Sequence, residues 1–587
     1  GKKGDAVVQM NWKAIDAGVD AVHKVNVPES WHNPAPDAAP KALKGPDALV
    51  KQIRDVMEPI SRMDGDSLPV SAFEGNVNGE WEQGASAYEK RGTAVMVPEW
   101  DAEKCIQCNQ CAFVCSHATI RPFCLTADEA ANAPESTKLA DTKPKASEYK
   151  FTMAVSPLDC MGCGECVTVC PTKAIEMKPQ ESQAAQQAAF DYCVENIRKK
   201  DNIPGVVSDI SVKGSQFNQP LLEFSGSCAG CAETSYARLI TQLFGEKMFI
   251  SNATGCSSIW GGTASISPYT TNKESGFGPA WINSLFEDNA EHGLGMQIGY
   301  ETVRANLITK VEALKGKNAD LDAVIDKYLE TKNNTKANDA PAKALIAALE
   351  ACGCDESKEI LKDKQYLAKK SFWIFGGDGW AYDIGYGGLD HVLASGHDVN
   401  VMVFDTEMYS NTGGQASKAS NIGEVCQFAA AGKEISKKSL AEICMTYGYI
   451  YVAQIALGAN MAQAVKAIAE AEAYPGPSII IGYAPCELHG VKGGMTNCQN
   501  EMKKAVEAGY WNLFTFNPAL KAEGKNPFTL TSKAGKMDKY QEFLANETRY
   551  SRLSRAFPDR AKALFEKNQE AAEARYTHLT KLVDLYK

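Results

Sequence analysis

Long apolar runs are missing from this sequence. Hydrophobic residues make up 44% of its 587 residues and charged residues 23%, the balance of an ordinary globular protein. No segment approaches the roughly 18 uninterrupted apolar residues of a membrane-spanning helix. The apolar segments 399–404 and 477–484 are short enough to be buried strands. We therefore expect no membrane partner, and several domains, because one hydrophobic core does not serve a chain of this length.

The sequence also has no excess of positive charge. It carries 61 basic and 72 acidic residues, a net charge of −11, and no Arg- or Lys-rich run with interleaved aromatic residues, so we expect no nucleic-acid partner. A local group of lysines surrounds the second cysteine motif described below. Their two interpretations are a solvated face and a docking patch for an acidic redox partner: Lys143, Lys145, Lys150, Lys173 and Lys178.

The first residues, GKKGDAVVQMNW, contain neither an apolar signal region nor an initiating Met. We expect a cytoplasmic protein whose sequence is the later half of a longer polypeptide. Residues 1–35 are then the tail of an upstream domain, and residues 36–95, rich in Pro, Gly, Asp and Ala, a loop-rich connector.

Cysteine, by contrast, is abundant. Its 19 copies do not suit a disulfide framework, since the chain is large and carries no secretory signal. The clustered C-x2-C spacing favours metal ligands in a reducing compartment.

Two stretches, CIQCNQCAFVC (105–115) and CMGCGECVTVC (160–170), share the spacing C-x2-C-x2-C-x3-C. In two-cluster ferredoxins each such run supplies three ligands to one 4Fe–4S cluster and its fourth Cys to the other. Zinc modules, the alternative, use two C-x2-C pairs separated by a longer loop. We predict a ferredoxin-like α+β domain at 96–180 with two ligand sets: Cys105, Cys108, Cys111 and Cys170; and Cys160, Cys163, Cys166 and Cys115.

A third, incomplete site is indicated by SGSCAGCAET, in which Cys228 and Cys231 have the spacing of half a metal site. Cys256 in NATGCSS and Cys486 in APCELHG are candidates to complete it. The remaining cysteines lack such context and are expected to be free thiols: Cys124, Cys193, Cys352, Cys354, Cys426, Cys444 and Cys498.

From about 200 to 515, apolar strands alternate with amphipathic helices. The strand candidates are 371–375, 399–404, 450–456 and 477–484, and the alternation predicts a mostly parallel α/β sheet. Residues 315–368 are predicted to be a helical insertion, and residues 516–587 a charged helical C-terminal extension.

A phosphate-binding loop is predicted in FGGDGWAYDIGYGGLDHV (375–392), which follows a strand and opens a helix. Glycines let the backbone approach phosphate, and a helix N-terminus favours its negative charge. Asp378 can supply a hard oxygen to Mg²⁺. After the next strand, DTEMYSNTGGQ (405–415) offers Thr406 and a nearby backbone carbonyl to the metal, and Asn411 to the same rim.

A GDG motif followed by an Asn-containing loop about 30 residues later resembles the thiamine-diphosphate signature. A dinucleotide site is not expected, because no G-x-G-x-x-G with a following ribose-binding acid is present.

Together with GPAWINSLFEDNAEHGLGM and TEMYSNTGGQASKA, these motifs resemble single-chain pyruvate:ferredoxin oxidoreductases over essentially the whole sequence. The resemblance implies oxidative decarboxylation of pyruvate with coenzyme A to acetyl-CoA and CO₂. It implies thiamine diphosphate, Mg²⁺ and three 4Fe–4S clusters that pass electrons to ferredoxin or flavodoxin. It also implies a homodimer, and further substrate-binding residues in an absent N-terminal half.

The resemblance implies roles for individual residues as well. A third cluster maps to Cys228, Cys231, Cys256 and Cys486, and Mg²⁺ to Asp378, Thr406 and the carbonyl of Met408. Asn411 would face the reacting substrate as the catalytic residue. Thiamine diphosphate would be contacted by a larger set: Glu233, Cys256, Gly377, Asp378, Gly379, Trp380, Thr406, Glu407, Met408, Tyr409, Ser410 and Asn411.

Three alternatives stay open at this point. They are an oxidoreductase for another 2-oxoacid, an electron-transfer module without thiamine chemistry, and a non-oxidative thiamine decarboxylase, which would have no use for the cluster thiolates. Five histidines are expected to be ordinary helix, loop or core residues, with only His489, near Cys486, a candidate for supporting a site: His117, His292, His391, His397 and His489.

Overall fold

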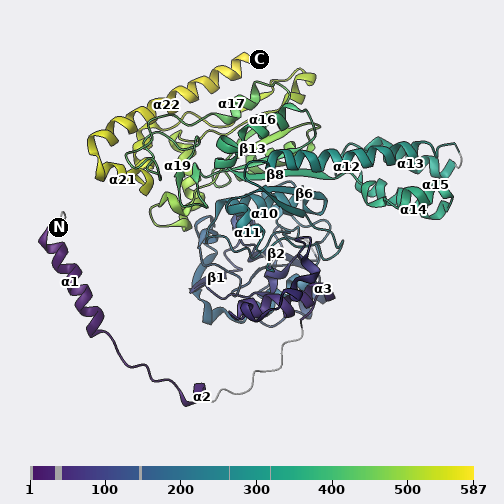
Figure 1. Ribbon diagram of the computed structural model, residues 1–587. Helices are drawn as coiled ribbons and strands as arrows, with labels where there is room; N and C mark the ends of the chain where they lie inside the picture. The colour runs from purple at the N-terminus through teal and green to yellow at the C-terminus, as the bar shows by residue number, and fades with distance from the viewer. Residues whose placement is uncertain (1–3, 33–42, 145–147, 264, 317–318) are drawn as a thin grey trace. The chain divides into compact units, whose positions relative to one another are not determined.

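The computed structural model describes residues 4–32, 43–144, 148–263, 265–316 and 319–587 (Figure 1). Lys145 of the predicted lysine patch lies outside these residues. The chain forms two compact units, Gly1–Val50 and Lys51–Lys587. Among the described residues no helix has both the length and the apolar character needed to cross a membrane.

The first unit contains helices α1 (Asp5–Asp20) and α2 (Glu29–His32), and α3 (Asp47–Gln52) spans the boundary between the units. None of the α1 side chains is buried. The assignment of residues 1–35 to an upstream domain stays a prediction.

An eight-stranded sheet forms the centre of the second unit, in the order β15-β14-β12-β13-β9-β8-β6-β7. The six strands from β12 to β7 run parallel, and β14 and β15 are antiparallel. Their bounds are β6 Met248–Ala253, β7 Ala280–Ser284, β8 Ser371–Gly377, β9 Asn400–Asp405, β12 Tyr451–Ile455, β13 Ser478–Tyr483, β14 Phe514–Phe516 and β15 Phe528–Leu530.

The central strands read as continuous apolar runs because helices cover both faces of a parallel sheet. Every residue of β9 and of β13 is buried. All four strands predicted from the sequence are present, and the predicted mostly parallel sheet is confirmed. The helices packed around it are α10 Ala232–Phe244, α12 Asn289–Glu312, α16 Tyr386–Ala394, α17 Leu440–Met445, α18 Met461–Ala473 and α19 Cys498–Ala508.

A ferredoxin-like region precedes the sheet. It pairs β1 (Met96–Trp100) with β5 (Ile175–Pro179), and β2 (Ile120–Leu125) with β4 (Lys150–Val155), both antiparallel. The short strand β3 (Ala140–Asp141) joins β4 at the edge. Each cysteine run ends in a short helix, α5 (Gln110–Val114) or α7 (Glu165–Thr168), and these two helices contact each other.

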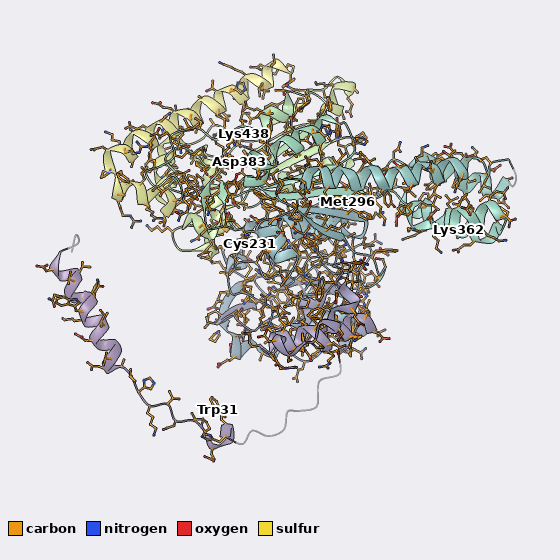
Figure 2. All side chains as sticks on the ribbon, viewed as in Figure 1. Trp31, Cys231, Met296, Lys362, Asp383 and Lys438 are labelled. Carbon is orange, nitrogen blue, oxygen red and sulfur yellow. The ribbon has the colours of Figure 1, made fainter. Side chains whose placement is uncertain are left out.

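The ferredoxin-like region is fixed to helix α10. Buried Arg238 donates to the carbonyl of Phe113 over 2.5 Å, and Ser235 Oγ donates to the carbonyl of Val114 over 3.1 Å. Both donors belong to α10, and both acceptors to α5. The cysteine runs are therefore held against the helix that follows Cys231, labelled in Figure 2.

The predicted insertion at 315–368 is helical, with α13 (Ala319–Thr331), α14 (Asp339–Cys352) and α15 (Asp355–Leu361). These helices share a small core of their own with the end of α12, in which Val311 belongs to the same buried cluster as Ile325 and Leu345.

The C-terminal segment is mostly helical, with α20 (Tyr540–Ala545), α21 (Thr548–Ala556) and α22 (Pro558–Leu585). Within the range predicted as a helical extension, however, β15 completes the sheet. Phe528 is buried and pairs with Phe516 of β14, and this three-residue strand is too short to show a period in the sequence. The connector at 43–95 also carries short helices, among them α3 and α4 (Glu58–Ser61).

Candidate functional site

The predicted site residues gather at the carboxyl ends of four neighbouring strands. In the sheet, β13, β9, β8 and β6 are adjacent in that order. The loops after them carry Cys486, Thr406, Asp378 and Cys256, respectively. Ligand sites of open α/β sheets form at this edge.

Asp378 is the centre of a group of oxygen atoms. Its Oδ1 accepts from the backbone N–H of Thr406 (3.2 Å) and lies 2.9 Å from Thr406 Oγ1. Thr406 Oγ1 is also 3.0 Å from the carbonyl oxygen of Met408. One hydroxyl proton cannot serve both acceptors, so this group has more acceptor oxygens than hydrogen-bond donors. A hard cation such as Mg²⁺ binds to oxygen atoms of this kind. The residues Asp378, Thr406 and Met408 therefore fit a magnesium ion.

The electrostatics of Asp378 point the same way. Its side chain is fully buried, and burial together with the neighbouring carboxylate of Asp405 raises its pKa well above the ordinary value. Among the described residues no Lys, Arg or His forms an ion pair with it. A bound divalent cation reverses this penalty and keeps the carboxylate charged.

Glu407, the next residue after Thr406, is buried in a left-handed conformation with φ 61°. Lys437 Nζ lies 3.0 Å and Arg549 2.8 Å from its carboxylate oxygens. Burial opposes its charge, but these two cations outweigh burial and lower its pKa to about 2. Strained backbone at such a position persists only where its surroundings fix it. Glu407 lies between Thr406 and Met408, two of the predicted metal ligands.

The glycine loop fits closely against the next loop. A Cβ at Gly379 would lie 2.6 Å from the ring of Tyr409, so only glycine allows this approach. Trp380 is buried between Gly376 and Gly385, which makes its side chain part of the core. Asn411, predicted as catalytic, is exposed at the end of its loop.

Sequence reasoning missed Ser417. Its Oγ donates to Asp378 Oδ2 over 2.6 Å, which makes it the main partner of that oxygen. The residue is brought there by the small hairpin of β10 (Met408–Tyr409) and β11 (Gln415–Ala416). The signal available in the sequence was a hydroxyl residue just after the glycine pair of the same loop.

His489, singled out in the sequence, also reaches this loop. Its Nε2 lies 2.7 Å from the carbonyl oxygen of Thr406 and donates to it. The ring is fully buried, so it supports the loop from the protein interior.

The four cysteines of the proposed third site are electrostatic neighbours. Burial raises the pKa of the Cys256 thiol, and Glu233, Cys231, Cys486 and Cys228 raise it further. For Cys486, burial raises the pKa to about 11. Thiols in such a place become thiolates when a metal cluster supplies positive charge.

The third set adjoins the oxygen group. The hydroxyl of Ser410 lies 2.7 Å from Thr406 Oγ1, and it also forms a hydrogen bond with the thiol of Cys486. Glu233, in the first turn of α10, is buried, which raises its pKa to about 7.

The cysteines of each predicted crosswise set lie near one another. A small cavity is lined by Cys105, Cys108, Cys111 and Cys170, with Trp100 and Ile175. Burial is the main cause that raises the pKa of Cys166, and the neighbouring Cys163, Cys115 and Cys160 raise it further.

Backbone geometry repeats between the two runs. Gln107 and Asn109 have φ of 58° and 62°, and the equivalent Gly162 and Gly164 have 69° and 80°. The N–H groups of Gln107 and Gly162 point at the sulfurs of Cys105 and Cys160, each over 3.3 Å. Such N–H···S bonds stabilise cluster-bound thiolates.

A segment after β13 lies between the second and third cysteine sets. The buried Cys498 thiol interacts electrostatically with both Cys231 and Cys163. Added Cβ atoms at Gly164 and Gly230 would lie 2.8 Å from Thr496 and 3.0 Å from Met495, respectively. Residues 495–498 therefore bridge the two cysteine sets.

Within the described part of the chain, no group of three or more His, Cys, Asp or Glu side chains is arranged to hold one metal ion. What places the cysteines of each set near one another is that their thiols raise one another's pKa. The first set also lines one cavity.

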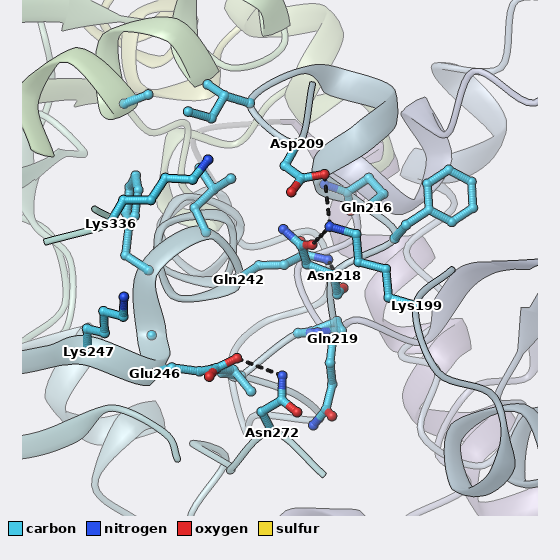
Figure 3. Close-up of a pocket in the computed structure, with 18 of the residues that line it drawn as sticks. Lys199, Asp209, Gln216, Asn218, Gln219, Gln242, Glu246, Lys247, Asn272 and Lys336 are labelled. Carbon is cyan, nitrogen blue, oxygen red and sulfur yellow. Dashed lines mark hydrogen bonds and ion pairs between the residues drawn. The ribbon is translucent and has the colours of Figure 1, made fainter. Parts of the chain in front are cut away.

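A cavity of about 590 Å³ lies elsewhere (Figure 3). It includes Lys247 and Pro475, which come just before or near the amino ends of β6 and β13. Lys199 pairs with Asp209 over 2.8 Å at its wall. None of the predicted site residues lines it, so we do not place the candidate site there.

Comparison with known proteins agrees with this layout. Residues 104–174 match the family model of the 4Fe-4S dicluster domain. Residues 361–481 match that of the C-terminal TPP binding domain of thiamine pyrophosphate enzymes, and residues 37–94 match a domain of unknown function.

Full-length similarity is stronger still. The chain is 48% identical over 590 residues to a pyruvate-flavodoxin oxidoreductase of Klebsiella pneumoniae, covering 99% of this chain and 49% of the relative. It is 48% identical over 597 residues to the pyruvate:ferredoxin oxidoreductase of Moorella thermoacetica, covering 100% of this chain and 50% of the relative. Over its whole length the chain is similar to pyruvate:ferredoxin (flavodoxin) oxidoreductases.

The chain spans about half the length of these two curated relatives. A pyruvate dehydrogenase [NADP(+)] of Euglena gracilis is 44% identical over 595 residues, which cover 32% of that relative. A solved 2-oxoglutarate:ferredoxin oxidoreductase from Magnetococcus marinus aligns with a TM-score of only 0.28 and 15% identity, over 45% of this chain and 64% of that one.

For a pyruvate:ferredoxin oxidoreductase, the dicluster and thiamine-diphosphate domains are the cofactor-binding parts, and both are present here. The matched ranges contain the eight ferredoxin-type cysteines, Asp378 and Thr406. Cys228, Cys231, Cys256 and Cys486 lie outside them, so the third cluster is a proposal.

Proposed function

We propose that this chain supplies the thiamine-diphosphate site and the electron path of an enzyme that oxidises pyruvate with coenzyme A. The products are acetyl-CoA and CO₂, and the electrons leave for ferredoxin or flavodoxin. The observation that carries this proposal is the single edge of the sheet where the oxygen group of Asp378 adjoins the third cysteine set through Ser410.

In this proposal bound thiamine diphosphate supplies the carbanion chemistry that decarboxylation requires. The chain supplies placement. Asp378, Thr406 and the Met408 carbonyl would hold Mg²⁺, which would neutralise the charge of the diphosphate. Ser417 orients the carboxylate of Asp378, and the left-handed Glu407 fixes the loop that carries the other two ligands.

The cysteine sets provide an exit for electrons. The third set adjoins the cofactor loop, and residues 495–498 bridge it to the set containing Cys163. That set in turn neighbours Cys111 of the first set. We propose this order of transfer, because a one-electron acceptor must take a two-electron oxidation in steps.

The docking surface for the carrier is proposed next to the first set. Lys143 is exposed, and its Nζ donates to the carbonyl of Cys105 over 2.7 Å, so one cation lies beside the outermost ligand loop. This favours a docking role for at least this lysine. Lys150 and Lys178, in contrast, pair with Asp141 and Glu176.

Other features of the enzyme extend the proposal. A second half, of the length that the relatives carry, would complete it and supply further substrate contacts, and we propose a cytoplasmic homodimer. The remaining alternative substrate is another 2-oxoacid, because Asn411 is the one predicted substrate contact within this chain.

The metal-holding role of Asp378 is tested by calorimetry on the complete enzyme that carries this chain, with thiamine diphosphate titrated in the presence and absence of Mg²⁺. We expect Mg²⁺-dependent binding that Asp378→Asn lowers by at least about tenfold, since a charged ligand to the metal is lost. Asp390→Asn, in α16 and hydrogen-bonded to Tyr447, is the matched control. Equal affinity with and without Mg²⁺ would contradict the assignment.

A further inference from the structure

The sequence C-G-C at 352–354 lies between two helices of the insertion and takes no part in the function proposed above. Cys352 is the last residue of α14, and Cys354 precedes α15. Between them Gly353 adopts the left-handed conformation, with φ 62°. This turn brings both side chains to the same side, and the two sulfurs are in hydrogen-bond contact over 3.2 Å.

A buried hydroxyl group fixes the pair. Ser357 Oγ lies 3.1 Å from the sulfur of Cys354, and Ser357 itself is fully buried. Hydrogen bonds from Ser357 and from the backbone and thiol of Cys354 lower the pKa of Cys352 below its ordinary value. A lowered pKa raises the fraction of thiolate, the nucleophilic form of cysteine.

Access to solvent separates this pair from the chain's other thiols outside the cysteine sets. Cys352 is exposed and Cys354 is half-buried. By comparison, burial raises the pKa of Cys124, of Cys193 and of Cys444 to about 12. Those thiols are inert by burial, whereas Cys352 combines exposure with a neighbouring thiol in contact.

We propose that Cys352 and Cys354 form a thiol–disulfide exchange site whose substrates are disulfides of low-molecular-weight thiols. The Cys352 thiolate attacks one sulfur of the disulfide R–S–S–R, forming a mixed disulfide and releasing one thiolate. The Cys354 thiolate then attacks the Cys352 sulfur and releases the second. The two electrons given up as the Cys352–Cys354 bond forms reduce R–S–S–R to two thiols, which take up the two protons.

The position of the pair indicates a reversible reaction. A disulfide across a single intervening residue closes a very short loop and removes little chain entropy from the unfolded state, so it cannot act as a structural staple. It would also be exposed, and exposed disulfides are the readily reduced ones. The turn lies at the N-terminal end of α15, and Lys362, labelled in Figure 2, follows the C-terminal end of this helix.

The test uses the full chain with its clusters loaded, kept free of oxygen and equilibrated with mixtures of glutathione and glutathione disulfide. Free thiols are blocked with iodoacetamide before and after denaturation. The mass of the peptide containing residues 352–354 is then measured by mass spectrometry. We expect a peptide in which neither thiol reacts with iodoacetamide and whose mass is lower by two hydrogen atoms than that of the reduced, unblocked peptide. Dithiothreitol should restore the reaction of both thiols.

Two variants separate the roles of the two thiols. In Cys354→Ser, Cys352 should accumulate as a mixed disulfide with glutathione, because no second thiol displaces it. In Cys352→Ser, modification of Cys354 should be about tenfold slower, because the more nucleophilic, exposed thiol is gone. The peptide containing buried Cys444 serves as an internal control and should stay reduced throughout. Equal, slow modification of both single variants, or a pair that stays fully blocked by iodoacetamide, would overturn the proposal.

Discussion

At the residue scale, the oxygen group around Asp378 depends on one side chain that no motif revealed. Ser417 is the hydrogen-bond donor to Asp378 Oδ2. Ser417→Ala should weaken Mg²⁺-dependent thiamine diphosphate binding by about five- to a hundredfold, because a buried charged acceptor loses its donor, at a cost of about 1–3 kcal/mol. Calorimetry on the complete enzyme measures this.

The matched control for that change is Ser395→Ala. Ser395 is an exposed serine whose hydroxyl donates to the Val392 carbonyl and accepts from the His397 N–H, both nearby in the chain, and its loss should leave binding unchanged. If both serine variants bound the cofactor as the parent does, Ser417 would have no part in the site.

Glu472 makes a separate, pH-dependent contribution to stability. It accepts from Ser371 and Trp373 while its Oε1 has no partner among the described residues. Burial raises its pKa to about 7. Because its folded pKa is above the unfolded one, its stabilising effect is complete below about pH 4.5 and is lost as the pH rises toward 7.

Glu472→Gln should therefore match the parent near pH 4.5 and be more stable than it above pH 7, by at most about 3 kcal/mol. Denaturant unfolding at several pH values, followed by circular dichroism, measures the difference. Glu566→Gln, an exposed position on α22, is the control. A parent–variant difference that does not change with pH would exclude this account of Glu472.

Much of the residue-level site could be predicted from the sequence. Asp378 and Thr406 follow apolar strands and lie where that pattern places them, and the cysteine spacing indicated the crosswise sets. Ser417 could not be predicted, because its approach depends on the β10–β11 hairpin, whose two-residue strands show no period. Trp380 stays a predicted cofactor contact, and its ring packs between Gly376 and Gly385.

At the element scale, the loops that carry cysteines fit together through glycines. Gly164 has φ 80°, and a Cβ there would lie 2.8 Å from Thr496. Gly79 has a similar φ of 76°, but open space around its Cβ position. Both glycines thus carry the cost of a left-handed side chain, but only Gly164 lies between two cysteine ligands and against Thr496.

Gly164→Ala should loosen the loop of the second cysteine set and lower the iron bound per chain, whereas Gly79→Ala should leave the iron content unchanged. Iron and sulfide analysis, with electron paramagnetic resonance of the reduced clusters, measures both. Unchanged iron content in Gly164→Ala, or equal iron loss in Gly79→Ala, would contradict this account of the loop.

Element identity was predictable where the sequence pattern is long. Strands β8, β9, β12 and β13 match their predicted segments, and helix α16 lies where the glycine loop was predicted to open a helix. The order of strands was not predictable, because β13 inserts between β12 and β9 through contacts distant in sequence. Strand β15 was missed because pairing with β14, and not local pattern, makes it a strand.

At the scale of the whole molecule, the fold sets cofactor chemistry and electron exit side by side. Helix α10 begins at the third cysteine set and is bonded at its side to helix α5 of the ferredoxin-like region. A single rigid element therefore connects the edge of the sheet to the ferredoxin-type clusters, and residues 495–498 add a second connection.

The central claim is that pyruvate oxidation at this edge reduces the clusters of this chain. Its most direct test is anaerobic electron paramagnetic resonance of the complete enzyme that carries the chain, with thiamine diphosphate and Mg²⁺, before and after pyruvate. We predict reduced-cluster signals and release of CO₂ with pyruvate, and neither with Asp378→Asn. Clusters that dithionite reduces but pyruvate leaves oxidised would contradict the account.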